Sequence, residues 1–341
     1  MLPAKVLQFG TIQIPNAVLL APMEDVTNLP FRLICKAMGA DIVYTEFASS
    51  DGLVRNAAKT LQKIRIDERE RPVGIQIFGG DPETMRQAAR IAEQFEPDFI
   101  DINCGCWVKN VVRRNAGAAL LRDIPRMVHL VKTVIDSVRL PVTVKTRLGW
   151  DRHSIRIVEV AQQLEDIGVA ALAIHCRTRD MGHQGTPLWE WIDRVKEKVS
   201  MPVILNGGIT SWQTAAEAFW NTQCDAIMVG KAAIGNPFIF REAKHYLQTG
   251  QPPTPPSLEE RIAVCLQHLE LTLEFYGTER GIRIFRKYYS GYFKGLPRSA
   301  QLRQQLVTAA SYEEVQTLLE HYLEQFHQHS TPLELATSSA E

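Results

Sequence analysis

Residues 101–110 place several reactive side chains in a short stretch of the chain. They read Asp-Ile-Asn-Cys-Gly-Cys-Trp-Val-Lys-Asn and begin within the apolar run of residues 99–102. Two thiols and an amide therefore occur where a buried strand should end. Because barrel enzymes position reactive groups on loops that follow rigid strands, the sequence predicts an active-site loop here.

Cys104 and Cys106 form a Cys-x-Cys pair. A zinc or iron–sulfur site needs two further ligands at characteristic spacing, and the neighbouring sequence offers none, so we predict no metal. A disulfide between residues two apart would be strained. We therefore expect Cys104, still in strand register, to pack in the core. Cys106 follows the flexible Gly105 and can turn into a site as a proton donor or thiolate.

Polar residues stand at the ends of the predicted strands. In chain order they are Pro22, Met23, Glu24, Glu46, Gln76, Asn103 to Cys106, Lys145, Arg147, His175, Arg177, Asn206 to Gly208, Gly230 and Lys231. Lys145 could form a Schiff base, as in some aldolases, or stabilise an anionic ring or enolate. Beside Gln76 and Asn103 it better resembles the polar edge of a flavin site, because the pyrimidine portion of a flavin needs several donors. His175 alone could be a packing residue, so the prediction depends on the convergence.

Glycines after the last two predicted strands indicate a phosphate site. They occur in Asn206-Gly207-Gly208, in Gly230-Lys231 and in Gly235-Asn236-Pro237. Backbone amides beside a helix N-terminus stabilise a phosphate, and Lys231 adds a cation. The alternative is that these glycines only permit tight turns.

Eight short apolar segments must position these residues. They are residues 17–23, 41–47, 73–79, 99–105, 142–149, 171–177, 202–208 and 226–231. Most are continuously apolar, as expected for parallel strands buried on both faces. Amphipathic stretches lie between them at 82–95, 125–138, 154–167 and 211–222. Eight βα units predict an α/β fold, a TIM (β/α)8 barrel, with a doubly wound sheet as the alternative.

A proline-rich segment at residues 249–256 marks a domain boundary, because it is too rich in proline for a helix. Residues 1–248 are expected to form the barrel. Helical patterns that start at capping sequences follow, so residues 257–328 are expected to form a small all-α bundle. Residues 329–341 are small and polar and are expected to be disordered.

The 38 basic and 38 acidic residues cancel, so any affinity for nucleic acid must come from a local patch. Two patches stand out. Lys109, Arg113 and Arg114 follow the active-site loop, and six cations between Arg283 and Arg303 occur without an acidic residue. Aromatic residues lie among the second set: Phe285, Tyr288, Tyr289, Tyr292 and Phe293. They could form the bundle core, or exposed tyrosines could stack on bases while the cations bind phosphates.

Six scattered cysteines and the absence of a signal-peptide profile predict a reduced, cytoplasmic protein. No apolar run is long enough to span a bilayer, so no membrane association is expected. Nothing in the sequence requires an obligatory protein partner.

The sequence resembles the tRNA-dihydrouridine synthases over nearly its whole length. The motif at residues 101–106, followed by Gly117 and Leu120-Leu121, carries most of the resemblance. Supporting motifs lie at residues 76–79, 144–147, 174–179, 206–209 and 235–237, and the match extends from residues 20–23 to 294–297.

The resemblance implies FMN-dependent reduction of uridines in tRNA, with NADPH or NADH reducing the flavin. It implies an FMN site of Pro22, Met23, Glu24, Gln76, Lys145, His175, Asn206, Gly207, Gly208, Gly230 and Lys231. Cys106 resembles the proton donor, Asn103 would hold the uracil, and Lys109 and Arg177 would also bind substrate. The basic helical domain would bind the tRNA.

The chemistry suits those residue types. Hydride should enter uracil at C6, and the resulting enolate should take a proton at C5 from an acid across the ring. A thiol, with a reference pKa of roughly 8.5, is protonated at neutral pH and can serve. The nucleotide must also leave its stack, at a cost of about a few kcal/mol.

Three residues depart from the usual family pattern. Trp107 replaces the proline that usually follows the cysteine, Lys231 replaces an arginine, and Tyr288 stands where a basic motif is common. Three other functions remain open from the residues alone. They are an FMN barrel enzyme for a small pyrimidine, of dihydroorotate dehydrogenase type, a non-catalytic tRNA-binding protein, and a Schiff-base aldolase.

Overall fold

The chain forms two compact units in the computed structural model, which describes residues 5–330. The first unit comprises the chain up to Ala233 together with Phe238–Pro253. The second comprises Ile234–Pro237 and the chain from Thr254 onward. The predicted tail of residues 329–341 lies almost entirely outside the described residues.

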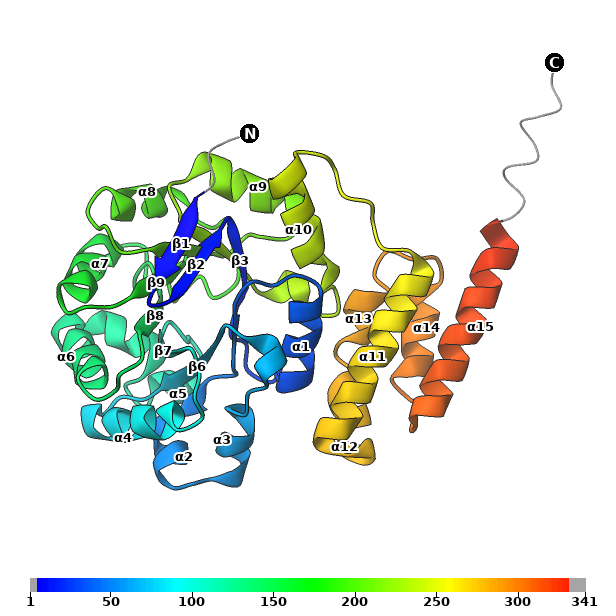
Figure 1. Ribbon diagram of the computed structural model, residues 1–341, viewed down its shortest axis with the longest axis horizontal. Coiled ribbons are helices and arrows are strands. Elements are labelled where there is room, and N and C mark those ends of the chain that lie inside the picture. The colour runs from blue at the N-terminus through cyan, green and yellow to red at the C-terminus, as the bar shows by residue number, and fades with distance from the viewer. Residues whose placement is uncertain (1–4, 331–341) are drawn as a thin grey trace, which may run out of the picture. The chain divides into compact units, whose positions relative to one another are not determined.

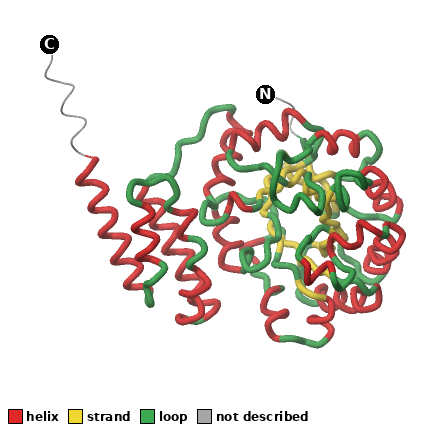
Figure 2. Tube along the Cα trace, turned by 180° about the vertical axis from the view of Figure 1, so that it is seen from behind, coloured by secondary structure: helices red, strands yellow, loops and turns green. Residues whose placement is uncertain are grey.

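The first unit is a barrel of eight parallel strands surrounded by helices (Figure 2). The strands are β3 (Ala17–Leu20), β4 (Val43–Tyr44), β6 (Val73–Phe78), β7 (Phe99–Cys104), β8 (Val142–Arg147), β9 (Ala171–His175), β10 (Val203–Asn206) and β11 (Ala226–Val229). β3 pairs with β11, and backbone bonds from Leu20 N to Ile42 O and from Asp41 N to Val18 O connect it to the β4 segment. The sheet therefore closes on itself. The predicted TIM barrel is confirmed, and the doubly wound alternative is wrong.

Helices cover the outside of the barrel (Figure 1). They are α1 (Leu29–Ala37), α2 (Ser50–Val54), α3 (Ala58–Lys63), α4 (Pro82–Glu93), α5 (Lys109–Val112), α6 (Ile124–Ile135), α7 (Ile157–Asp166), α8 (Glu190–Lys196), α9 (Trp212–Asn221) and α10 (Phe238–Thr249). The four amphipathic stretches of the sequence correspond to α4, α6, α7 and α9. Local signals set their starts: the Asp81 side chain accepts a bond from Thr84 N, and Pro82 opens α4. Among residues 5–330, none of the helices has the length and apolar character needed to cross a membrane.

A hairpin of β1 (Val6–Phe9) and β2 (Ile12–Pro15) precedes the barrel and was not predicted. Its apolar side chains Leu7, Phe9 and Ile12 are buried in one cluster with strand residues that include Ala17 and Phe99. Those strand residues begin β3 and β7, so the hairpin closes the amino-terminal end of the barrel. The opposite, carboxyl end is left for the polar residues.

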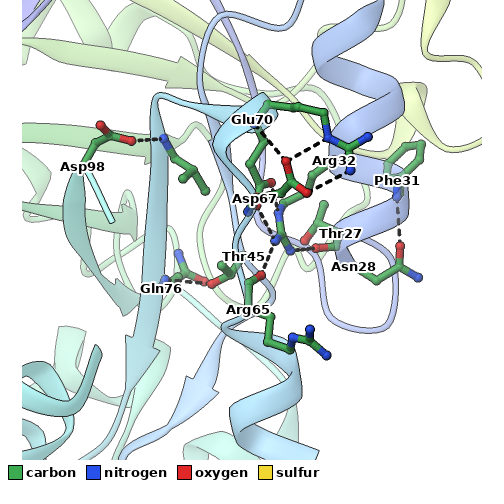
Figure 3. A network of polar contacts seen from close by, with 12 residues as sticks. Thr27, Asn28, Phe31, Arg32, Thr45, Arg65, Asp67, Glu70, Gln76 and Asp98 are labelled. Atoms are coloured by element: carbon green, nitrogen blue, oxygen red, sulfur yellow. Dashed lines mark hydrogen bonds and ion pairs between the residues drawn. The ribbon is translucent and has the colours of Figure 1, made fainter. Parts of the chain in front are cut away.

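A buried ion pair joins α1 to the short helix η1 (Glu68–Glu70) (Figure 3). Arg32 and Glu70 are both fully buried, and two hydrogen bonds of 2.6 and 2.9 Å join them. Two further guanidinium hydrogens bind the carbonyls of Thr27 and Arg65. Glu70 also accepts from Asp67 N. Both carboxylate oxygens and four of the five guanidinium N–H groups are thus hydrogen-bonded, and such pairing is the condition under which buried charges are tolerated.

The second unit is helical. It contains α11 (Leu258–Tyr276), α12 (Thr278–Phe285), α13 (Tyr289–Tyr292), α14 (Ser299–Leu306) and α15 (Tyr312–Ser330). α11 packs against α12, α13 and α15, and α14 packs against α15. The Ser257 side chain caps α11 by accepting from Glu260 N.

The aromatic residues of this unit form its core. Tyr288, Tyr289 and Tyr292 are at most 1 % exposed, and Phe285 and Phe293 are fully buried. The idea that these tyrosines stack on bases is therefore wrong, because no ring face is accessible. The cations of this segment lie at the surface instead: Arg283, Arg286, Lys294 and Arg298 are exposed.

Gly235 belongs to this second unit and is explained by packing. A Cβ at this position would lie 2.1 Å from the carbonyl oxygen of Tyr288 and 2.9 Å from Gly291 Cα. Only a residue without a side chain permits this approach. The suggestion that Gly235-Asn236-Pro237 serves a phosphate is therefore replaced by a packing role.

Candidate active site at the carboxyl end of the barrel

Strand register brings the predicted polar residues to one end of the barrel. Asn103 on β7 pairs with Lys145 on β8, and Asn206 on β10 pairs with His175 on β9. Gln76 on β6 lies beside Asp101 on β7. Because parallel strands share their direction, the loops that follow them open at the same end.

Three buried polar side chains form a relay between β6 and β7. Asp101 accepts from Gln76 Nε2 at 2.6 Å and from Thr143 Oγ1 at 2.6 Å. Gln76 Oε1 accepts from Asn103 Nδ2 at 2.9 Å. Burial raises the pKa of Asp101 to about 6. The carboxylate therefore fixes the orientation of the Gln76 amide, and that amide fixes Asn103. Each of the two amides, Gln76 and Asn103, has a second side-chain N–H that these bonds do not use.

The relay ends on the loop that carries Cys106. Asn103 Oδ1 accepts from Gly105 N at 3.1 Å and from Cys106 N at 2.9 Å. Cys106 O in turn accepts from Ala118 N at 2.9 Å. Cys106 is half-buried, whereas Cys104 is fully buried, as expected for a packing residue. The loop is thus held by side-chain and backbone bonds on both sides of the thiol.

Burial raises the pKa of the Cys106 thiol, and the Val108 backbone N–H, followed by the nearby Arg147 and Lys145, opposes the shift only in part. A thiol with a raised pKa holds its proton at neutral pH. Cys106 therefore carries the proton that a general acid needs, and no neighbouring acid has to supply it beforehand.

Lys145 faces Asn206 across the barrel mouth. Its Nζ donates to Asn206 Oδ1 at 2.9 Å, and Asn206 Nδ2 donates to Met228 O. Burial, followed by repulsion from Arg147, lowers the pKa of Lys145 to about 8. The ammonium is thus mostly charged at pH 7, and one amide orients it.

His175 and Arg177 form a second contact at the end of β9. His175 is 8 % exposed, and burial together with the surrounding cations lowers its pKa well below the usual value, so the ring is neutral. Arg177 Nη1 lies 3.2 Å from His175 Nε2, which therefore accepts the bond. Arg177 also donates to the carbonyls of Gln184 and Gly185. Most guanidinium N–H groups of Arg177, a predicted substrate ligand, thus hold His175 and the loop that follows β9.

Gly207 and Gly208 follow β10 with φ values of +105° and +87°. A Cβ on Gly207 would lie 2.8 Å from the His175 ring, so only glycine fits there. Within the described part of the chain their backbone N–H groups donate no hydrogen bond. Two adjacent free donors next to neutral His175 match the needs of an anion.

Arg147 was noted at the end of its strand but given no role by the sequence. It is 3 % exposed, and its Nε donates to Gly105 O at 2.9 Å. Its Nη1 donates to Thr178 O and, at 2.8 Å, to Gly182 O. One guanidinium thus ties the Cys106 loop to the loop after β9. The sequence offered one indication of this role: Arg147 lies two residues after Lys145, and residues two apart on a strand face the same side.

Comparisons with known proteins now decide the family. A family model described as "Dihydrouridine synthase (Dus)" matches residues 19–328. The chain belongs to the dihydrouridine synthase family. It is 40 % identical over 300 residues to tRNA-dihydrouridine synthase B of Pseudomonas aeruginosa, and the aligned region covers 88 % of this chain and 90 % of that relative. It is also 40 % identical over 313 residues to tRNA-dihydrouridine synthase B of Xanthomonas campestris, with 92 % and 94 % covered.

Two solved structures share the dihydrouridine synthase chain's fold at low identity. An amine oxidase for 6-hydroxypseudooxynicotine from Pseudomonas geniculata matches with a TM-score of 0.58 and 14 % identity, over 94 % of this chain and 66 % of the other. An old yellow enzyme homologue from Zymomonas mobilis matches with a TM-score of 0.51 and 13 % identity, over 76 % and 96 %. The family model and the relatives confirm two predictions: the dihydrouridine synthase family and, as the class of that family, an oxidoreductase.

The remaining predicted residues lie around the mouth of this dihydrouridine synthase barrel. Pro22 and Met23 are half-buried after β3. Gly230 follows β11, and a Cβ at this position would be in van der Waals contact with Met23 Sδ, 3.9 Å away. Lys231 is exposed and near enough to His183 to depress its pKa. Lys109 is exposed at the start of α5.

Glu24 is exposed and forms an ion pair with Lys63. Glu24, Asp25 and Glu46 can bring oxygens within 4.8 Å of one another. Lys63 also lies 3.9 Å from Glu46, so one ammonium offsets part of the negative charge of these three carboxylates. The sequence did not indicate this contact, in which the predicted cofactor ligand Glu24 pairs with Lys63 at the end of α3.

Proposed function

We propose that this chain reduces particular uridines of tRNA to 5,6-dihydrouridine in the cytoplasm, with FMN as its cofactor and NADPH or NADH as reductant. The observation that carries the proposal is the half-buried Cys106, whose loop is held by Asn103 at the end of a barrel that also presents Lys145. In this proposal residues 1–248 are catalytic, 249–256 are a linker, and 257–328 bind tRNA.

The residues present fit a flavin mononucleotide. Lys145 and the spare N–H of Gln76 are donors of the kind that the pyrimidine carbonyls and ring nitrogens of a flavin require. The free N–H groups of Gly207 and Gly208, with Gly230 and Lys231 nearby in the barrel order, suit a phosphate. Pro22, Met23 and Glu24 line the end of β3, and His175 packs against Gly207.

When bound, the flavin supplies a hydride for the C6 carbon of uracil. The chain's own residues do the rest. The spare N–H of Asn103 is placed to hold a uracil carbonyl, and Cys106 gives its thiol proton to C5 as the C5=C6 bond is reduced. Arg147, 2.9 Å from Gly105 O, holds the loop and lies near the thiolate that remains. Lys109 and the spare hydrogens of Arg177 contribute positive charge for the phosphates.

The test is to map dihydrouridine across total tRNA from cells with and without this chain, and to complement with variants. Loss of Cys106 should remove a general acid, so Cys106→Ala should reduce dihydrouridine formation by about 100-fold or more while FMN stays bound. Cys104→Ala is the matched control, because that thiol is buried two positions away and its removal should leave the modification in place.

Two outcomes would overturn the proposal. If tRNA from the deletion strain keeps every dihydrouridine while free uracil or orotate is turned over in vitro, the enzyme acts on a small pyrimidine. If the purified protein stays colourless and takes up no FMN, the chain is a binding protein without this chemistry.

A further inference from the structure

Two adjacent apolar residues next to Cys106 are exposed. Trp107 is 40 % exposed and Val108 is 46 % exposed. Within residues 5–330 the other large apolar residues with comparable exposure are scattered singly: Val6, Val54, Trp220 and Val307. Single exposed apolar residues are ordinary, but an exposed indole one residue from a reactive thiol has to be explained.

The indole is held in place rather than free to move. The Trp107 ring lies 3.9 Å from the position that a Cβ on Gly182 would take, so the indole faces that glycine. It also meets the His183 ring edge to face, with centroids 5.8 Å apart and planes at 86°. Arg147 joins the backbones on both sides, with bonds to Gly105 O and Gly182 O. One side of the indole is therefore supported, and the rest is open to a ligand.

The surroundings of the indole are cationic. Burial and the charges of Lys231, Arg147 and Arg177 lower the pKa of His183 to about 4, so this ring is neutral and adds no charge. Lys109 follows two residues later, and Arg113 and Arg114 are exposed at the end of the same short helix. An exposed, fixed aromatic ring among unneutralised cations matches a single-stranded nucleic acid, whose bases stack and whose phosphates need positive charge.

We propose that Trp107 is a stacking subsite for an unpaired nucleobase adjacent to the uridine that enters the barrel. This inference rests on the proposed function, because it assumes that tRNA is the substrate. A reacting uridine must leave its stack, so its neighbour loses a stacking partner, and Trp107 would replace that partner. The indole thereby offsets part of the cost of extracting the uridine.

The experiment compares Trp107→Ala and Trp107→Phe in the full-length, FMN-loaded enzyme, with total tRNA from cells that lack the chain as substrate. Trp220→Ala is the matched control, because Trp220 is 51 % exposed on α9 and packs against Tyr246. The readouts are kcat and KM for tRNA and, separately, the rate of flavin reduction by NADPH without tRNA.

Trp107→Ala should raise KM for tRNA by about 5- to 150-fold, the range that corresponds to loss of one base–aromatic stack. Trp107→Phe should restore most of the loss, because phenylalanine keeps a ring face. Trp220→Ala should match the wild type, and flavin reduction should be equal in all four proteins. Wild-type dihydrouridine formation in the same assay verifies the proposed function independently.

Three results would overturn the inference. An unchanged KM in Trp107→Ala would mean that no base stacks there. A fall in kcat alone, not restored by phenylalanine, would assign Trp107 to support of the Cys106 loop. A slower flavin reduction without tRNA would assign the indole to the nicotinamide instead.

Discussion

At the scale of single residues, the two thiols of the Cys-x-Cys pair differ because of where the strand ends. Cys104 is the last residue of β7 and is fully buried, and its pKa is raised by burial beyond any working range. Cys106 lies beyond Gly105 and is half-buried. One residue, Gly105, thus separates a fully buried thiol from a half-buried one, as their positions in the sequence predicted.

Asn103 shows what residue types alone could not reveal. The sequence indicated an amide that binds uracil, but its oxygen is occupied by the N–H groups of Gly105 and Cys106. The side chain therefore shapes the loop first, and only its remaining N–H can meet a base. Such a double role depends on three-dimensional bond angles and leaves no trace in spacing.

The pKa of Lys145 gives a prediction at this scale. Because its pKa in the folded protein is lowered to about 8, Lys145 is charged below that pH and becomes neutral as pH rises through it. A bond from an ammonium is stronger than one from a neutral amine by roughly 1 kcal/mol, about fivefold in affinity. The Kd for FMN, followed by flavin fluorescence, should therefore increase by about that factor between pH 7 and 9.

Two variants make the assignment specific. Lys145→Met should bind FMN more weakly, with little pH dependence of the Kd. Cys106→Ala lacks the other titratable group of the site and should keep the wild-type pH dependence, because the effect is assigned to Lys145. A wild-type Kd that stays constant from pH 7 to 9 would show that the charge on Lys145 does not contribute to cofactor binding.

At the scale of elements, the Arg32–Glu70 pair carries a prediction for the barrel. Arg32→Met leaves the Glu70 carboxylate buried without its partner, which costs about 3–5 kcal/mol in comparable cases. Adding Glu70→Gln removes that charge, so the double variant should recover a substantial part of the lost free energy of unfolding. Urea denaturation monitored by far-UV circular dichroism measures both. Equal stabilities of the single variant and the wild type would contradict a structural role for the pair.

The elements also show how far sequence patterns reach. All eight barrel strands fall within the apolar segments, because strands buried on both faces must be continuously apolar. The β1–β2 hairpin was missed even though Val6 to Pro15 partly alternates, because a short hairpin is stable only when it packs on a core that the local sequence does not contain. Arg147 was undervalued for the same reason: its acceptors, in residues 105, 178 and 182, are far apart in the chain.

At the scale of the whole molecule, a chain with no net charge carries local surfaces of one sign. Each unit has its own exposed cations: Lys109, Arg113 and Arg114 in the barrel, and Arg286 and Lys294 among those of the helical unit. The sequence predicted these clusters from the absence of acidic residues between them. It could not decide which aromatic rings were accessible, since burial of Tyr288 depends on how α11, α12 and α13 pack together.

The final prediction concerns the helical unit and salt. If its exposed cations contact tRNA phosphates, each contact releases counterions, and log K falls with log salt with a slope of roughly −0.7 to −0.9 per contact. The double variant Arg286→Ala/Lys294→Ala should therefore bind tRNA more weakly at low salt and show a slope smaller by up to about 1.4–1.8. FMN binding should be unchanged, because both side chains are exposed in the second unit.

A charge-matched control separates specific contacts from a general loss of positive charge. Arg139 and Lys198 are exposed and precede β8 and β10, at the end of the barrel opposite Cys106. Arg139→Ala/Lys198→Ala removes the same formal charge and should keep the wild-type slope when binding is measured by filter retention between 50 and 300 mM salt, a range of about sixfold that resolves such a change. Equal slopes for the two double variants would mean that net charge alone governs binding and that the helical unit does not hold the tRNA.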